Sequence, residues 1–280
     1  MNTLYGLWRR LPVVIQAFLL GGVVSLTGVL PWMGFVSINL WFKPALPWVV
    51  PIALLYLLAW WKVVRRQPDV RNLEPTEDQW SGAILAGFLG LMALVIGSAL
   101  MNRMVQLPQQ QTGDIPQIPM LSLFVYLVAS AAFAGVVEET AFRGFMQRRI
   151  EQRHGPAVAI VITSTAFGFA HFTHPEVTLA LMPFFIGAGV VYGLIAYLTD
   201  SVLPSMFLHT MGNIFSGFDL FTRGQSEWQT PKAPAALIWE TGPDATFWFG
   251  CAAFVLVSCA AAFAYGSLAR TSTRPSTRTV

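Results

Sequence analysis

Charged residues are scarce in this 280-residue chain. Only 11% of the residues are Asp, Glu, Lys or Arg, whereas 55% are hydrophobic. Soluble proteins carry about 25% charged residues, so this chain has too little polar surface to remain soluble. Its formal net charge of +3 gives no reason to expect nucleic-acid binding, because that function requires a basic patch on a soluble face. The composition excludes a soluble enzyme and indicates an integral membrane protein.

Cysteine is scarce as well. The chain has 2 cysteines, Cys251 and Cys259, and both lie in one apolar run, so they would share a helix and cannot bridge each other. They do not predict a metal site. No internal repeat is present either, so the sequence does not indicate an inverted-repeat transporter.

Long apolar runs are the main feature that the chain does have. A helix needs roughly 20 apolar residues to cross about 30 Å of hydrocarbon. The runs lie near residues 11–30, 46–64, 81–102, 120–142, 157–172, 179–199, 204–221 and 246–268. We therefore expect an all-α polytopic membrane protein with about eight transmembrane helices. It would form one integral-membrane domain over residues 1–280, with a disordered tail at 271–280.

The basic residues predict the orientation of these helices. With eight spans, both chain ends lie on one side of the membrane, and most lysines and arginines fall on that side. They are Arg9, Arg10, Lys62, Arg65, Arg66, Arg71, Arg143, Arg148, Arg149, Arg153, Arg270, Arg274 and Arg278, against Lys43, Arg103, Arg223 and Lys232 on the other. By the positive-inside rule, both termini should be cytoplasmic.

Three polar clusters interrupt the apolar runs. Polar groups within a membrane helix are costly and are candidates for function. In EETAFR, Glu139 and Arg143 are four residues apart and can pair on one helix face, while Glu138 is rotated about 100° away and points elsewhere. One carboxylate is thus expected to have a partner and the other to be free.

The other two clusters lie on later runs. In FGFAH, Phe167 and His171 are four residues apart, and so are His209 and Asn213 in HTMGN. At 1.5 Å per helical residue, these side chains and Glu138 can meet in the cytoplasmic half of the bilayer. We expect a buried polar active site there.

This set of residues suits hydrolysis of an amide. A carboxylate and a histidine can activate water, and a second histidine with an asparagine can donate hydrogen bonds to an oxyanion. Glu138, His171 and His209 are also suitable ligands for Zn²⁺, which would lower the pKa of a bound water. The residues alone leave both mechanisms open, and buried Glu and His also occur in proton-coupled transporters.

The three clusters, in this order, resemble the motifs of the CAAX-protease and bacteriocin-processing (CPBP, or Abi) family of intramembrane proteases. The motifs of that family read E-E-x-x-x-R, F-x-x-x-H and H-x-x-x-N or D, and every fixed position matches. The motif core covers residues 120–221. The chain contains no H-E-x-x-H, which agrees with the glutamate-dependent mechanism that the resemblance implies. It also contains no G-x-S-x-G and no G-x-G-D, which argues against serine and aspartyl intramembrane proteases.

The resemblance implies a role for each motif residue. Glu138 and His171 would activate the water, Glu139 would hold Arg143, and His209 with Asn213 would stabilise the oxyanion. Phe167 would support the site. No cofactor is expected from the resemblance, and Zn²⁺ remains the alternative.

The resemblance also implies the setting. The protein would be an endopeptidase of the membrane, acting on a hydrophobic or membrane-anchored protein or peptide in contact with lipid, and we expect it in a bacterial inner membrane. The alternative from another class is a non-catalytic immunity or scaffold protein of the same fold.

Overall fold

The computed structural model describes residues 2–41, 46–67, 70–71, 73–105, 120–173, 179–223 and 236–272. The long helices are α2 (Val13–Trp41), α3 (Leu46–Val64), α4 (Glu77–Asn102), α5 (Met120–Glu139), α7 (Pro156–Ala170), α8 (Met182–Thr199), α9 (Leu203–Arg223) and α11 (Ala245–Thr271). The short ones are α1 (Asn2–Arg10), the π-helix η2 (Thr140–Gln147), α6 (Arg148–His154), the 3-10 turns η3 (His171–Thr173) and η4 (Leu179–Leu181), and α10 (Ile238–Thr241). The predicted all-α class is confirmed.

The molecule is a helical polytopic membrane protein. Within the described ranges, 5 helical segments are long and apolar enough to cross a membrane. These segments are Val13–Ile38, Glu77–Asn102, Phe124–His154, Leu179–Thr199 and Ala245–Thr271. Each of the remaining predicted runs also forms a helix, but the apolar parts of α3 and α7 are shorter, and α9 is interrupted by polar residues.

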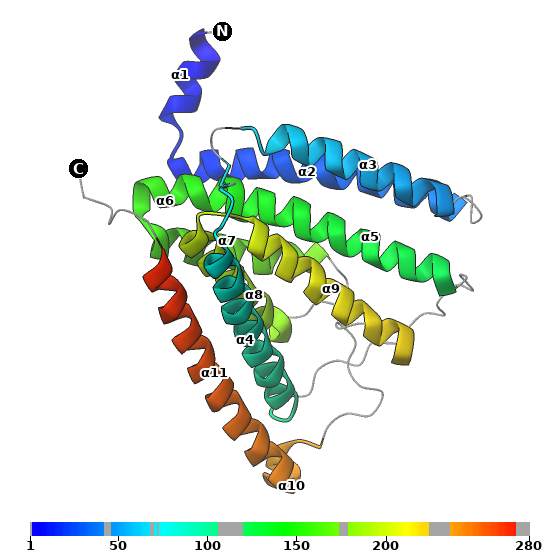
Figure 1. The fold of residues 1–280 in the computed structure, drawn as a ribbon, viewed down its shortest axis with the longest axis vertical. Coiled ribbons are helices and arrows are strands. Elements are labelled where there is room, and N and C mark those ends of the chain that lie inside the picture. The colour runs from blue at the N-terminus through cyan, green and yellow to red at the C-terminus, as the bar shows by residue number, and fades with distance from the viewer. Residues whose placement is uncertain are drawn as a thin grey trace.

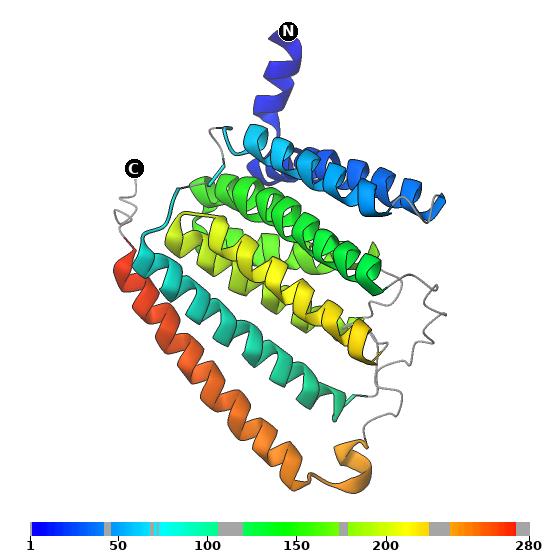
Figure 2. The same cartoon turned by 45° about the vertical axis from the view of Figure 1, so that its right-hand side comes forward.

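The helices are arranged in neighbouring layers (Figures 1 and 2). Helices α2 and α3 form one edge of the molecule, and α11 forms the opposite edge, where it packs against α4. Between these edges, α5 packs against α9, and α7 packs against α8. The motif-bearing helices therefore occupy the interior of the bundle. Both chain ends lie at the same end of the molecule.

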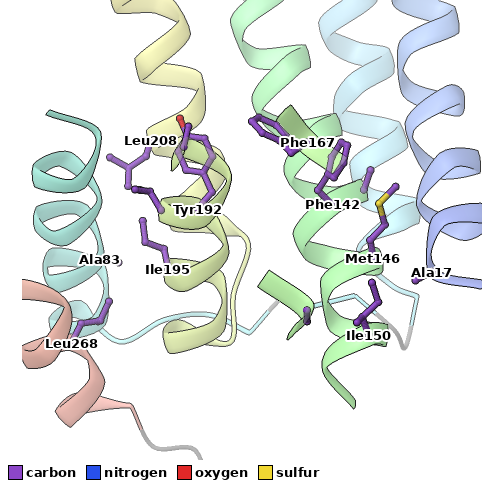
Figure 3. Packing of buried hydrophobic residues seen from close by; sticks show 14 residues of the cluster. Ala17, Ala83, Phe142, Met146, Ile150, Phe167, Tyr192, Ile195, Leu208 and Leu268 are labelled. Carbon is purple, nitrogen blue, oxygen red and sulfur yellow. The ribbon is translucent and has the colours of Figure 1, made fainter. Parts of the chain in front are cut away.

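The core consists of apolar side chains from most of these layers (Figure 3). Phe142 and Met146 from η2, Phe167 from α7 and Tyr192 from α8 belong to one buried cluster. Close approach of α7 and α8 depends on Gly189, because a Cβ there would lie 2.9 Å from the Cα of Ser164. Gly189 and Gly193 form a small-xxx-small pattern within residues 187–193 (GAGVVYG), and such a pattern predicts close helix packing.

Two details differ from the helices that the sequence predicts. The fourth run is α-helical only to Glu139, and η2 then follows as a π-helix. Isolated π turns within α-helices are frequent at functional sites. The fifth run ends at Ala170, so His171 is the C-cap of α7 and not an interior position.

Arg143 does not belong in the count of basic residues that predicts the orientation of the helices. Its side chain is fully buried in the bundle and pairs with Glu139, so it is no loop residue. The other basic residues assigned to the same side still outnumber those on the opposite side.

Candidate active site

The four-residue spacing of Glu139 and Arg143 in EETAFR produces an ion pair inside the bundle. Arg143 Nη1 donates to Glu139 Oε1 at 2.9 Å, and both side chains are almost completely buried. Arg143 Nη2 also donates to the backbone carbonyl of Gly189 on α8 at 3.1 Å. A buried arginine requires such partners because an unpaired charge in a low-dielectric interior is strongly destabilising. The predicted Glu139–Arg143 pair is confirmed.

Aromatic rings surround the guanidinium of Arg143. Its Cζ lies 4.4 Å from the ring centroid of Phe167 and 5.4 Å from that of Tyr192. The negative faces of aromatic rings attract a cation at such distances. Phe167 therefore stabilises the buried charge as well as filling the core.

His209 of α9 lies between the two glutamates. Its Nδ1 is 2.9 Å from Glu139 Oε1, and its Nε2 is 3.9 Å from Glu138 Oε2. Glu138 does not point elsewhere, as the helical rotation predicted; both carboxylates approach one imidazole, through its two different nitrogens. The two glutamates differ in exposure, since the side chain of Glu139 is 0% exposed and that of Glu138 is 29% exposed.

The hydrogen bond to Glu139 determines which ring nitrogen of His209 carries the hydrogen. An ionised carboxylate can only accept, so Nδ1 of His209 is the donor. In the neutral ring, Nε2 then carries the lone pair toward Glu138, and it becomes a donor only when the ring is protonated. Tyr192 stacks on the same ring with a centroid distance of 4.9 Å and an interplanar angle of 10°, which orients it.

His171 lies at the end of α7, against Phe167. Its Nδ1 is 2.8 Å from the backbone carbonyl oxygen of Phe167, and the two rings are 4.7 Å apart. A carbonyl oxygen only accepts, so Nδ1 carries the hydrogen and the neutral ring has its lone pair on Nε2. Phe167 also contacts His209, with ring centroids 5.8 Å apart. One phenylalanine ring thus lies against both histidines.

Asn213 lies one helical turn beyond His209 on α9. Its side chain is half-buried, and across the described ranges it makes no hydrogen bond. Its amide is therefore available to a ligand near His209, although the structure does not join it to the other site residues.

Metal ligation requires donors that converge on one point. Among the described residues, no three His, Cys, Asp or Glu side chains form a group that could hold a metal ion. This holds also for the predicted alternative Zn²⁺ ligands, which are Glu138, His171 and His209.

Sequence spacing predicted that motif residues of different helices can meet, but it did not predict which atoms are in contact. The 2.9 Å bond from His209 to Glu139, the carbonyl of Gly189 and the Tyr192 ring depend on how α8 and α9 pack on α5 and η2. Gln147 was missed too: it is fully buried and donates to the carbonyl of Gly193 at 2.9 Å. Its spacing of four residues from Arg143 on a helix was the signal available for it.

Comparison with known families agrees with this arrangement. Residues 120–215 match the family described as "Rce1-like: Type II CAAX prenyl endopeptidase Rce1-like". The matched segment begins at the first residue of α5, ends within α9 and includes all the site residues described above. The chain matches none of the curated proteins and none of the solved structures with which it was compared. Residues 120–215 are therefore similar to a domain of the Rce1-like type II CAAX prenyl endopeptidase (CPBP/Abi) family, which is a family of peptidases, and they lie in an integral membrane protein.

Proposed function

We propose that this protein is an intramembrane endopeptidase that uses a glutamate-activated water. The observation that carries the proposal is the position of His209 between Glu139, which is buried, and Glu138, which is partly exposed. One carboxylate holds the imidazole and Arg143, and the other remains accessible to water and substrate. A helix-end ion pair would not need this second carboxylate or the histidine.

Glu138 is the group that activates water in this proposal. The water oxygen attacks the carbonyl carbon of the peptide bond while its proton passes to the Glu138 carboxylate, and His171 orients the water through Nε2. Collapse of the tetrahedral intermediate breaks the C–N bond, and Glu138 returns the proton to the leaving amine. Glu139 is unsuitable for this role because its side chain is completely buried and its Oε1 already accepts from Arg143 and His209.

His209 and Asn213 stabilise the oxyanion. His209 donates from Nε2 when its ring is protonated. The Asn213 amide, one turn further along α9, supplies the second donor. Preorganised donors of this kind contribute on the order of 10²–10³ in kcat.

The substrate is a hydrophobic or membrane-anchored protein or peptide. The site lies within apolar helices, so a scissile bond must reach it from the lipid or from its boundary. The similarity of residues 120–215 to type II CAAX prenyl endopeptidases supports a substrate of this kind. We further propose that α3, α7 and α9 also span the membrane, giving eight spans with both termini cytoplasmic, in a bacterial inner membrane.

The deciding experiment is cleavage of a quenched-fluorescent library of hydrophobic peptides by the full-length protein in lipid. Glu138→Gln and His171→Ala are assayed with and without a strong zinc chelator. Glu240→Gln, a change at an exposed glutamate of α10, is the matched control. We expect cleavage by the wild type and the control, with and without chelator, and loss of cleavage in both site variants.

Each other outcome has a defined meaning. Cleavage that is lost on chelation and restored by Zn²⁺ would favour the zinc-dependent mechanism. Undiminished cleavage in Glu138→Gln would disprove the site assignment. A biological effect that persists in Glu138→Gln without any cleavage would favour the non-catalytic scaffold.

A further inference from the structure

A groove outside the candidate active site lies at the end of α3. It has a volume of about 760 Å³ and is lined by Leu58, Trp61, Lys62, Arg65, Arg66, Gln67 and Val70. In Figure 1, the end of α3 near Val64 lies at the same end of the molecule as both termini. This is the end that the basic residues assign to the cytoplasm.

The charge of the groove is of one sign. Among the lining residues that the structure describes, three are basic, namely Lys62, Arg65 and Arg66, and none is acidic. Within the ranges that the structure describes, the side chains of Lys62 and Arg66 form no ion pair. The groove therefore offers uncompensated positive charge to an anionic group.

The apolar surface beside these charges faces outward. Leu55 is 66% exposed and Leu58 is 63% exposed. Leu55, Leu58 and Lys62 follow the three- and four-residue steps of α3, so they lie along one face of that helix, and Arg66 lies in the turn directly after it. An outward apolar stripe that ends in cations, next to a tryptophan, is the pattern of a membrane boundary.

We propose that this groove binds the headgroup of an anionic phospholipid. The phosphate contacts Lys62 and Arg66, and an acyl chain lies along the exposed face of α3 at Leu58 and Leu55. Basic pockets between helices on the cytoplasmic side of a membrane are suited to such headgroups. A free phosphate or an acidic peptide would match the cations but not the apolar stripe that continues from them.

The groove is close to the catalytic domain. Val70 lines the groove, and it lies opposite Gly144 of η2, where an added Cβ would be 3.6 Å from Val70 Cγ1. The next residue, Arg71, is buried and forms ion pairs with Glu151 of α6 and Asp200 after α8. A lipid in the groove therefore holds a segment that connects η2, α6 and the turn before α9.

The test measures lipid retention and thermal stability of the full-length protein. Purified protein in neutral detergent is titrated with phosphatidylglycerol, with phosphatidylcholine, or with inorganic phosphate at matched ionic strength. Bound lipids are counted by native mass spectrometry. We expect phosphatidylglycerol alone to remain bound and to raise the thermal midpoint. In the double variant Lys62→Ala/Arg66→Ala, its apparent affinity should fall roughly 30-fold, since each cation near a membrane surface contributes on the order of one kcal/mol.

The matched control removes two charges from α1 at the same end of the molecule. Arg9→Ala/Arg10→Ala should retain phosphatidylglycerol as the wild type does. An equal loss in this control would show general attraction to positive charge and would overturn the site. Stabilisation by phosphate alone, or by phosphatidylcholine to the same extent, would overturn the lipid assignment. Should the double alanine variant fail to fold, Lys62→Gln with Arg66→Gln keeps the side-chain volume and tests the same prediction.

Discussion

At the scale of single residues, two neighbouring glutamates occupy different environments. Glu139 is enclosed and accepts from Arg143 and His209, whereas Glu138 is partly open and lies 3.9 Å from His209. The first arrangement serves stability and orientation, and the second leaves a carboxylate for chemistry. The two residues should therefore respond differently to the same substitution.

Glu139→Gln should destabilise the protein, because Arg143 would keep its buried charge without the carboxylate. Breaking a buried pair by removing one partner costs about 3–5 kcal/mol. Thermal unfolding in detergent should show a clearly lower midpoint for Glu139→Gln and an almost unchanged one for Glu138→Gln. Equal midpoints for the two variants would contradict the division of roles. Removing both charges in Glu139→Gln/Arg143→Met should recover part of the loss.

Asn213→Ala should reduce turnover more than substrate binding. The Asn213 amide is proposed to donate to an oxyanion that exists only in the transition state, so kcat should fall about 10²-fold or more with little change in KM. Steady-state kinetics on a peptide found by the library assay would measure this. Ser216→Ala is the control, because that hydroxyl lies one turn further on α9 and donates to the backbone carbonyl of Asn213. A change confined to KM would exclude the oxyanion role.

Sequence spacing identified the residues of the site but not their contacts. It predicted the Glu139–Arg143 pair and the contact of Phe167 with His171, since both join residues four apart on one helix. It could not predict that His209 bonds to Glu139, because that contact depends on the packing of α9 against α5. Helical rotation alone predicted that Glu138 points away from Glu139, whereas both carboxylates approach His209.

At the scale of helices, the close packing of α7 against α8 determines where α8 meets the buried Arg143 of the candidate site. Gly189 allows α8 to approach Ser164 on α7, and its carbonyl also accepts from Arg143. The same glycine thus brings a helix close and provides a hydrogen-bond partner for a buried cation. A side chain at position 189 would therefore displace both α8 and the carbonyl that accepts from Arg143.

Gly189→Ala should lower the thermal midpoint. The added Cβ would lie 2.9 Å from the Cα of Ser164, which is backbone and cannot rotate away. Overpacking of this kind costs about 1–3 kcal/mol. Gly266→Ala on α11 is the matched control, since a Cβ there meets nothing within 4 Å and alanine favours a helix. A midpoint for Gly189→Ala equal to that of the control would show that α7 and α8 separate without strain.

The start of α11 is fixed by Asp244, outside the membrane-spanning segment. The backbone N–H of Phe247 and then the side chain of Arg103 lower the pKa of Asp244 below its ordinary value of 3.8. Arg103 lies at the end of α4 and also donates to the carbonyl of Ala236 at 2.9 Å. This contact joins the two helices at the end of the molecule away from the termini.

The charge of Asp244 should stabilise the protein only above its pKa. A folded-state pKa below the unfolded value gives a contribution that is complete above about pH 4 and is lost as the pH falls through the folded pKa. Asp244→Asn should therefore have a lower thermal midpoint than the wild type at pH 7, and the difference should vanish in acid. Combining it with Arg103→Gln should reduce the difference at pH 7. A difference that persists unchanged in acid would exclude the charge as its cause.

Helix positions were predicted well because apolar runs mark them directly. The sequence did not predict the π-helix η2 or the end of α7 at Ala170. Both depend on local backbone geometry, which hydropathy does not report. They are also the points where the residues of the site leave regular helix geometry.

At the scale of the whole molecule, α1 and the C-terminal end of α11 lie at the same ends of the long helices, on opposite edges of the bundle (Figure 2). The eight crossings that we propose would produce this arrangement, and the excess of basic residues is the reason for assigning that end to the cytoplasm. Composition was sufficient to predict a polytopic helical protein. It was not sufficient to predict the neighbours of each helix, because lipid-facing and buried apolar residues have the same composition.

Reporter fusions should place both termini in the cytoplasm. A fluorescent protein that folds only in the cytoplasm should be active when fused to either terminus, and a periplasmic alkaline phosphatase should be inactive there. Fusions after Arg103 should show the opposite pattern. Activity of the phosphatase at one terminus alone would mean an odd number of crossings and would contradict the proposed eight spans.

The Glu139–Arg143 pair also has a consequence for synthesis. Its two members lie within one continuous helical segment, so the charge of each can be neutralised while that segment enters the bilayer. Gly189 and His209 belong to later segments of the chain and follow this one into the membrane. Insertion of this segment into the bilayer therefore does not depend on α8 and α9. The two charged side chains that are most costly in the membrane, Glu139 and Arg143, can already be paired when the segment inserts.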